Sequence, residues 1–170
     1  MPQHNAMPHR ANTLHPDDLA LGTWAYDLAR ELWPIPRSLT GWGVRKTLDI
    51  LGRELPGLQR HRTATGQQAF DWTIPNEWNL TRAWIETPDG ETICDTDTNT
   101  LHVMGYSTPI DKRLSLADLN THLYSEPEQP DAIPYVSSYY AENWGFCLTE
   151  TQRRTLRDGT YRAVVDATLA

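Results

Sequence analysis

Side chains that could bind a metal are few and widely spaced in this chain of 170 residues. None of its six histidines stands in an HExxH pairing, a spacing by which zinc sites are recognised. His122 lies four residues before Glu126 and close to Glu128. Pro127 interrupts any helix that would align them. We therefore predict solvated side chains at the end of a helix, and no metal site.

An acidic turn offers a second kind of metal chemistry. Asp95, Asp97 and Asn99 are spaced like the first ligands of a calcium loop. That loop also requires a glycine at its sixth position and a glutamate at its twelfth, where this chain has Thr100 and Tyr106. The pattern therefore predicts a polar turn between strands.

Nucleophilic catalysis is also weakly indicated. Ser107 follows His102 by five residues, but Pro109 ends the run that would have to form a Gly-x-Ser-x-Gly elbow. A triad depends on geometry that spacing alone does not define. We assign no catalytic residue to the chain, and we keep a small serine or cysteine hydrolase only as a remote alternative.

A short segment with one arginine and two hydroxyl groups precedes the second predicted helix. Arg37, Ser38 and Thr40 could hold a carboxylate or phosphate, because free backbone amides and the helix dipole favour anions at a helix N-terminus. Alternatively, Ser38 and Thr40 cap the helix and Gly41 permits a tight turn. Both interpretations stay open.

Aromatic side chains gather in the second half of the chain. Tyr135, Tyr139, Tyr140 and Trp144 stand within ten residues of one another. Such a group forms either the core of a small β-rich domain or an aromatic surface that contacts a ligand or another domain. Core packing is the commoner use, and the aromatic surface is retained as a second hypothesis.

The composition excludes several classes of protein. The formal net charge of -7 argues against a nucleic-acid partner, because such binding depends on basic residues that neutralise phosphates. No apolar run approaches the ~20 residues of a membrane span, so we expect no membrane partner. Cys94 and Cys147 belong to no CxxC pair, and we interpret them as buried small hydrophobes in a cytoplasmic protein.

Two amphipathic helices are predicted after a flexible tail over residues 1–15. The first begins near Pro16, and Leu21 and Trp24 belong to a stripe at helical spacing that should pack inward. The second is capped by Thr40 in the structural interpretation. Its apolar stripe consists of Val44, Leu48, Leu51 and Leu55.

Short strands and turns are predicted downstream of these helices. The turn at residues 88–90 indicates a hairpin, Ser115 is a candidate cap of one short helix, and Thr149 or Thr151 begins another. Strands are expected at residues 69–74, 81–86, 91–94, 102–107, 133–140, 145–148 and 161–168.

Four aromatic and proline-containing segments follow one another along the chain. They are Leu32–Gly41 (LWPIPRSLTG), Asp71–Trp78 (DWTIPNEW), Leu101–Ser107 (LHVMGYS) and Ile133–Tyr140 running on to Trp144–Cys147 (IPYVSSYY, WGFC). Together they resemble the N-terminal part of a bacterial family of aminopeptidase-like proteins. That family belongs to the zinc exopeptidase superfamily and carries a small inserted domain of unknown function. The resemblance covers about residues 17–170.

The resemblance implies an α+β fold in two parts. Residues 16–56 and 150–170 correspond to the start of an aminopeptidase-like α/β domain, and residues 57–149 correspond to a mostly β inserted domain. The implied family activity is metal-dependent hydrolysis of a peptide or amide bond at an N-terminus, with zinc as the cofactor. The zinc ligands of the family lie beyond residues 161–167, and none can be assigned here.

This chain alone is therefore expected to bind no zinc and to be inactive, as a truncated or split member of the family. A second chain or self-association would then complete the peptidase fold, which predicts an exposed apolar face on the helices and on the strand at residues 161–168. The alternative is a non-catalytic, aromatic-rich binding module, which should be a monomer with an aromatic pocket.

Overall fold

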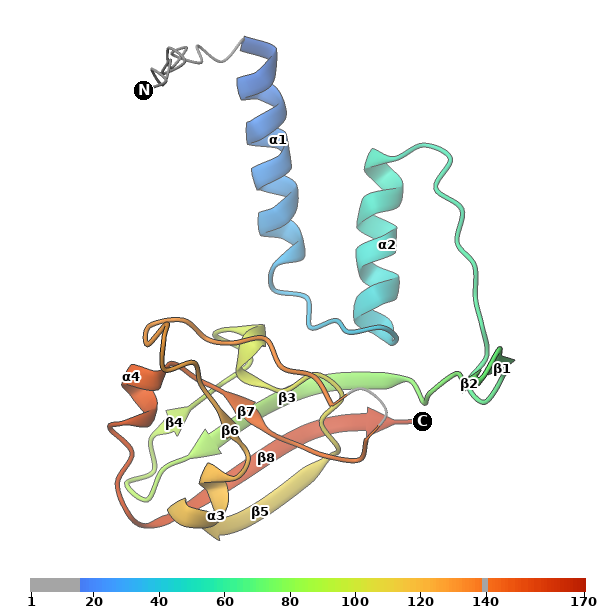
Figure 1. The fold of residues 1–170 in the computed structure, drawn as a ribbon. Coiled ribbons are helices and arrows are strands. Elements are labelled where there is room, and N and C mark those ends of the chain that lie inside the picture. Colours follow the sequence, from blue (N-terminus) through green and yellow to red (C-terminus); the bar gives the residue numbers. More distant parts are fainter. Residues whose placement is uncertain (1–15, 139–140) are drawn as a thin grey trace, which may run out of the picture. The chain divides into compact units, whose positions relative to one another are not determined.

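The computed structural model describes residues 16–138 and 141–170 (Figure 1). It contains helices and several sheets of short strands, which confirms the predicted α+β class. The chain divides into two units, Met1–Trp33 and Pro34–Ala170, and all strands of the described residues belong to the second.

Two of the sequence predictions concern residues outside this description. They are the tail over residues 1–15 and the two tyrosines Tyr139 and Tyr140 of the aromatic group. Within the described part of the chain, no helix is both long enough and apolar enough to cross a membrane.

Helix α1 (Pro16–Leu32) is the only described element of the first unit, and its predicted start is confirmed. Acidic residues in its first turn and Arg30 in its last turn complement the helix dipole. The packing of its apolar stripe stays a prediction, and Leu21 and Trp24 are 62% and 43% exposed along the helix.

A four-stranded antiparallel sheet organises the second unit. The strand order is β4-β3-β8-β5, so β3 and β8 are the inner strands. The pairing of β3 with β8 runs from Trp78 opposite Leu169 to Glu86 opposite Arg162. The strands are β3 (Trp78–Glu86), β4 (Thr92–Ile93), β5 (Ile110–Ser115) and β8 (Thr160–Leu169).

A register shift keeps the apolar side chains of β3 on the buried face. The shift lies between Leu80 and Arg82. Trp78 and Leu80 are buried before it, and Ala83 and Ile85 are buried after it. Because side chains alternate along a strand, one extra residue is needed to return Ala83 and Ile85 to the face of Leu80.

The hydrophobic core joins parts of the chain that the sequence prediction had separated. Phe146 and Leu148 lie in one cluster with Tyr161, Val165 and the buried side chains of β3. Residues 150–170 thus share a sheet and a core with residues 78–148. The expected exposed apolar face on the strand at residues 161–168 is not found, because Tyr161, Val164 and Val165 are all buried.

Helix α2 (Trp42–Glu54) has Gly41 at its N-cap position, where φ is +97° and no side chain caps the helix. A Cβ at this position would lie 2.2 Å from the carbonyl oxygen of Trp78, so the backbones can approach only at a glycine. The prediction that Thr40 caps α2 is wrong, because its hydroxyl group binds Tyr106 and the Trp78 amide instead.

Residues near the start of β3 fix the first turn of α2. The backbone N–H of Trp42 donates to Asn79 Oδ1 at 2.7 Å, and its indole N–H donates to the carbonyl oxygen of Leu80 at 3.3 Å. Arg45 forms two hydrogen bonds with the Glu77 carboxylate, at 2.7 and 2.8 Å. We call the contacts of these five residues the α2 joint.

The predicted apolar stripe of α2 is only partly buried. Val44, Leu48 and Leu51 are half-buried and Leu55 is 49% exposed, whereas Ile50, outside the stripe, is 5% exposed. The stripe therefore does not form the buried face of this helix.

The remaining elements are short. Ser115 and Thr149 are confirmed as caps, because their hydroxyl oxygens accept hydrogen bonds from the backbone amides of Asp118 and Gln152. The strand predicted at residues 69–74 is a hairpin, whose turn residue Phe70 has a φ of +56°. These elements are β1 (Gln68–Ala69), β2 (Trp72–Thr73), η1 (Thr100–His102), α3 (Leu116–Asn120), β6 (Leu123–Tyr124), β7 (Phe146–Cys147) and α4 (Glu150–Arg153).

Candidate functional site

The first three aromatic and proline-containing segments meet at the turn that contains Tyr106. Thr40 Oγ1 lies 2.7 Å from the Tyr106 hydroxyl group and accepts a hydrogen bond from the Trp78 amide at 3.1 Å. The rings of Trp78 and Tyr106 stack with their centroids 6.0 Å apart. The indole N–H of Trp78 donates to the carbonyl oxygen of Ser107 at 3.0 Å.

The fourth segment joins the same turn through its backbone. The Gly105 amide donates to the carbonyl oxygen of Val136 at 2.9 Å, and the Ser138 amide donates to that of Gly105 at 3.0 Å. The Met104 amide donates to the carbonyl oxygen of Gly145 at 2.9 Å. All four segments therefore converge on one place, which we call the motif node and define by Thr40, Trp78, Gly105, Tyr106 and Ser138.

The motif node replaces the strand predicted at residues 102–107. Tyr106 has a φ of +66°, a left-handed conformation that ends any strand at this residue. Such a conformation is unfavourable for a residue other than glycine and persists only where the surroundings determine it. Here the ring stacking and the hydroxyl contact of Tyr106 provide those surroundings.

The node does not assemble a nucleophile. Ser107 is fully buried, and its hydroxyl group donates to the carbonyl oxygen of Met104 at 2.7 Å and accepts from the Gly145 amide at 3.2 Å. His102 Nδ1 instead contacts the carbonyl oxygen of Cys147 at 2.8 Å. Since both side chains are bonded to backbone groups, His102 is not placed to activate Ser107.

The three residues of the predicted anion site point to different neighbours. Arg37 is exposed, and one of its guanidinium nitrogens donates to the carbonyl oxygen of Ile35 at 3.4 Å. The hydroxyl group of Ser38 is enclosed without a hydrogen-bond partner among the described residues. Thr40 is committed to the motif node. The structure therefore does not bring Arg37, Ser38 and Thr40 around a common ligand position.

The described residues of the predicted aromatic surface do not lie together either. Trp144 is 6% exposed, stacks on His122 with ring centroids 3.6 Å apart and meets Phe146 edge-on. Tyr135 is 63% exposed. Trp144 therefore belongs to the core and Tyr135 to the surface, as expected where aromatic residues mainly fill a small β-rich domain.

The histidines and acids are also held by other groups. His122 is half-buried, and its Nδ1 contacts the carbonyl oxygen of Trp144 at 2.9 Å, which corrects the prediction of a solvated helix end. Asp95 forms two hydrogen bonds with Arg82, at 2.6 and 3.1 Å, and these lower the pKa of its carboxyl group. The region with calcium-like spacing is the predicted polar turn, in which Asp95 also accepts from the Asp97 amide.

The donor groups do not fit the zinc that the resemblance implies. Among residues 16–138 and 141–170, no three His, Cys, Asp or Glu side chains come together as a metal site. Cys94 and Cys147 are free thiols, and both are buried, as predicted. Burial raises the pKa of Cys94 to about 12 and that of Cys147 to about 11, so both are protonated thiols at neutral pH.

A cleft of about 650 Å³ lies beside α2, and sequence reasoning missed it. It is formed by one side of α2, residues 60–63 and Glu77, which are distant in sequence. We call it the α2 cleft. The basic run Arg60-His61-Arg62 is a local signal for a polar surface. It could not have indicated the cleft itself, because no spacing rule relates these residues to α2.

Ion pairs line the α2 cleft. The Arg45 guanidinium and the Asn79 amide donate to the Glu77 carboxylate and lower its pKa to about 2. Arg60 pairs with Asp49 and also donates to the carbonyl oxygen of Leu48 at 2.9 Å. These contacts give the cleft charged walls that are held to α2.

Comparison with protein families gives a match over the sheet-containing part of the chain. Residues 77–168 match the family described as "Domain of unknown function (DUF2172)". The matched range extends from the residue before β3 almost to the end of β8, so it spans the sheet and its core.

Two relatives come from Clostridium acetobutylicum. A protein named "Putative polysaccharide biosynthesis protein with aminopeptidase-like domain" is 46% identical over 144 residues, which make up 85% of this chain and 33% of that protein. The crystal structure of a "putative peptidase" is similar to 88% of this chain and 35% of its own, with 45% identity and a TM-score of 0.83. This chain thus spans about a third of the length of these relatives.

Proposed function

We propose, because this chain belongs to the DUF2172 family, that it provides a non-catalytic domain of an aminopeptidase-like hydrolase. The observation that carries the proposal is the 46% identity to a protein named for its aminopeptidase-like domain. In this proposal the complete hydrolase belongs to the zinc exopeptidase superfamily and cleaves peptide or amide bonds at an N-terminus. Its zinc ligands lie outside these 170 residues.

The contacts of the candidate groups support a positioning role. His102 and His122 are bonded to backbone carbonyl oxygens, and both cysteines are buried thiols. The four recognised segments are used to join the loop before α2, the start of β3 and the turn at Tyr106. A region built in this way holds elements together, and we assign no reaction step to it.

The exposed apolar side chains of α1 support a partner for this helix. Leu21, Trp24 and Tyr26 are 62%, 43% and 68% exposed. Exposed apolar side chains grouped on one helix are typical of a surface that another polypeptide segment covers. The proposed partner is a second chain or another copy that completes the peptidase fold, and it binds through the helix rather than through β8.

A non-catalytic binding module is the second candidate. Tyr135 is the one residue of the predicted aromatic surface that the structure describes as exposed. Because Trp144 is buried, the described part of the aromatic group offers a ligand less surface than this alternative requires.

Metal content and turnover test the proposal together. The purified chain is loaded with zinc, dialysed, measured by elemental mass spectrometry and assayed with a panel of aminoacyl reporter substrates. The longer relative from C. acetobutylicum is treated identically as the reference. We expect zinc and turnover in the relative and neither in this chain. Stoichiometric zinc with turnover in this chain would contradict the proposal.

A further inference from the structure

The charges inside the α2 cleft do not balance. Two ion pairs, Arg45 with Glu77 and Arg60 with Asp49, use both carboxylates that line the cleft. Arg62 is the third arginine of the lining. One guanidinium group is therefore left over in a chain whose net charge is -7.

Arg62 is exposed to the cleft and has no hydrogen bond or ion pair with any residue of the described chain. A guanidinium group carries five N–H donors in a planar fork that matches the two oxygens of a carboxylate. Hydrogen bonds of this kind are about twice as strong as those between neutral groups. The N–H donors of Arg62 can therefore bind a carboxylate without breaking a contact among the described residues.

The walls around Arg62 are fixed and partly apolar. The hydrogen bond from Arg60 to the carbonyl oxygen of Leu48 ties the neighbouring segment to α2. Gly52 leaves the space for this contact, because a Cβ there would lie 3.0 Å from the Arg60 guanidinium. Val44 and Leu48, one turn apart on α2, present apolar side chains to the cleft.

We propose that the α2 cleft binds a small carboxylate that carries an apolar group. Arg62 receives the carboxylate, and Val44 and Leu48 contact the apolar group. One unpaired guanidinium matches one negative charge, whereas a phosphate ester carries about -1.5 to -2 at neutral pH and would remain partly unbalanced. The volume of about 650 Å³ lies within the range of small-molecule sites. This site is independent of the proposed hydrolase function.

Backbone amide shifts of α2, followed by NMR, test the proposal. N-acetyl-leucine is the carboxylate probe, N-acetyl-leucinamide is its neutral counterpart, and inorganic phosphate is the second anion. We expect saturable shifts with the carboxylate alone, and about tenfold weaker binding to Arg62→Ala, the loss typical of one hydrogen bond to a charged group.

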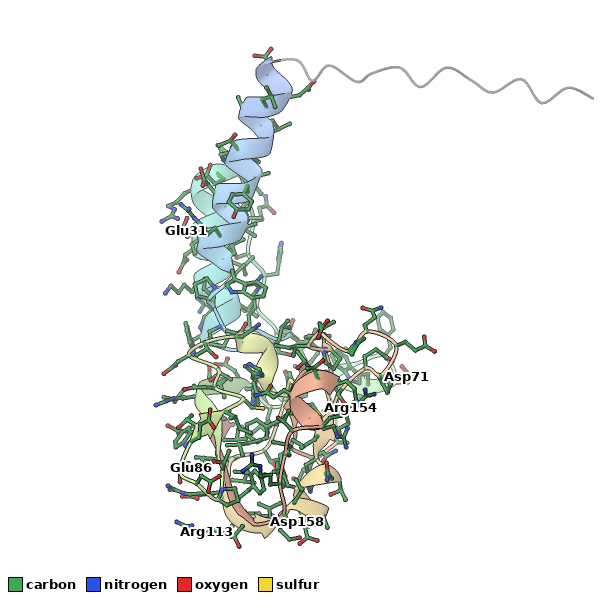
Figure 2. All side chains as sticks on the ribbon, turned by 90° about the vertical axis from the view of Figure 1, so that its left-hand side faces the viewer. Glu31, Asp71, Glu86, Arg113, Arg154 and Asp158 are labelled. Atoms are coloured by element: carbon green, nitrogen blue, oxygen red, sulfur yellow. The ribbon has the colours of Figure 1, made fainter. Side chains whose placement is uncertain are left out.

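Arg113→Ala is the matched control, because Arg113 is exposed on β5 at the end of the sheet away from α2 (Figure 2). It should bind the carboxylate as the wild type does. Since Arg62 has no partner among the described residues, its replacement should leave the fold unchanged, which circular dichroism verifies. Equal affinity of both variants, equal binding of the amide, or tighter binding of phosphate would each overturn the proposal.

Discussion

The sheet and the α2 joint lie in the same unit but are held together by different interactions. In the core against the sheet, Ala83 and Ile85 of β3 are fully buried together with Phe146 and Leu148. In the α2 joint, an ion pair and side-chain hydrogen bonds connect partly exposed groups. Apolar burial is large and insensitive to pH, whereas exposed ion pairs contribute little and are screened by salt.

This difference indicates that the protein opens locally at the α2 joint. Arg45 is 52% exposed and Glu77 is 33% exposed in their ion pair, so water and salt reach both groups. Local opening is cheapest where few apolar contacts are lost. We infer that α2 can detach from β3 while the sheet stays folded.

Truncation of a core side chain should have the largest effect. Phe146→Ala is expected to lower the free energy of unfolding by about 3–5 kcal/mol, because it removes a fully buried aromatic ring and leaves a cavity. Urea unfolding measures the loss. Tyr135→Ala, at an exposed aromatic residue, should stay within about 0.5 kcal/mol of the wild type. Similar losses of unfolding free energy in both variants would contradict the assignment of Phe146 to the core and Tyr135 to the surface.

Gly41→Ala should cause the next largest loss of unfolding free energy, and it tests the close approach of the α2 N-terminus to β3. The new Cβ would meet the carbonyl oxygen of Trp78 at 2.2 Å, in addition to the strain of a positive φ. Gly57→Ala is the control, since Gly57 has a φ of +94° with nothing within 4 Å. The control should lose about 1–2 kcal/mol, the cost of left-handed backbone alone, and Gly41→Ala should lose more. Equal losses would show that the close approach is unimportant.

Glu77→Gln should have a smaller effect that is confined to α2. We expect a change in unfolding free energy of about 1 kcal/mol or less, because the ion pair is exposed. Trypsin should nevertheless cleave faster after Lys46, within α2. Glu86→Gln removes one of the two acidic partners of Arg162 on the sheet and serves as the control. An unchanged rate of trypsin cleavage in Glu77→Gln would show that the ion pair of Arg45 with Glu77 does not hold α2 in place.

Acid should weaken the α2 joint over a defined range. Hydrogen bonds from Arg45 and then Asn79 lower the pKa of Glu77 from 4.5 to about 2. Because the folded pKa is the lower one, the contribution of Glu77 is complete above about pH 4.5 and is lost as the pH falls toward 2. The NMR shift of the Trp42 amide should follow this transition, and Glu77→Gln should abolish it. Titration of Glu77 near 4.5 would contradict the prediction.

Local signals predicted much of the secondary structure. The start of α1, the caps at Ser115 and Thr149 and the strand β8 follow from helical spacing, hydroxyl groups before a helix and a β-branched run. Strand β5 was missed because its sequence, IDKRLS, is charged and forms a strand only by pairing with the distant β8. The motif segments were recognised, but not their convergence.

The candidate site was less predictable than the fold. The α2 cleft depends on contacts between Arg45 and Glu77, 32 residues apart, and between Asp49 and Arg60, 11 apart. No periodicity links such residues. The left-handed Tyr106 at the motif node was likewise hidden in an apolar run that resembles a strand, because tertiary contacts override local preference there.

Hydrogen exchange, resolved by residue, tests the central distinction most directly. It compares the wild type with the double variant Glu77→Gln, Asn79→Ala, which removes the ion pair and the acceptor of the Trp42 amide. The account predicts faster exchange in α2 and unchanged exchange at the paired amides of β8. Equal acceleration in α2 and β8 would contradict it, because the joint and the core would then open as one cooperative unit.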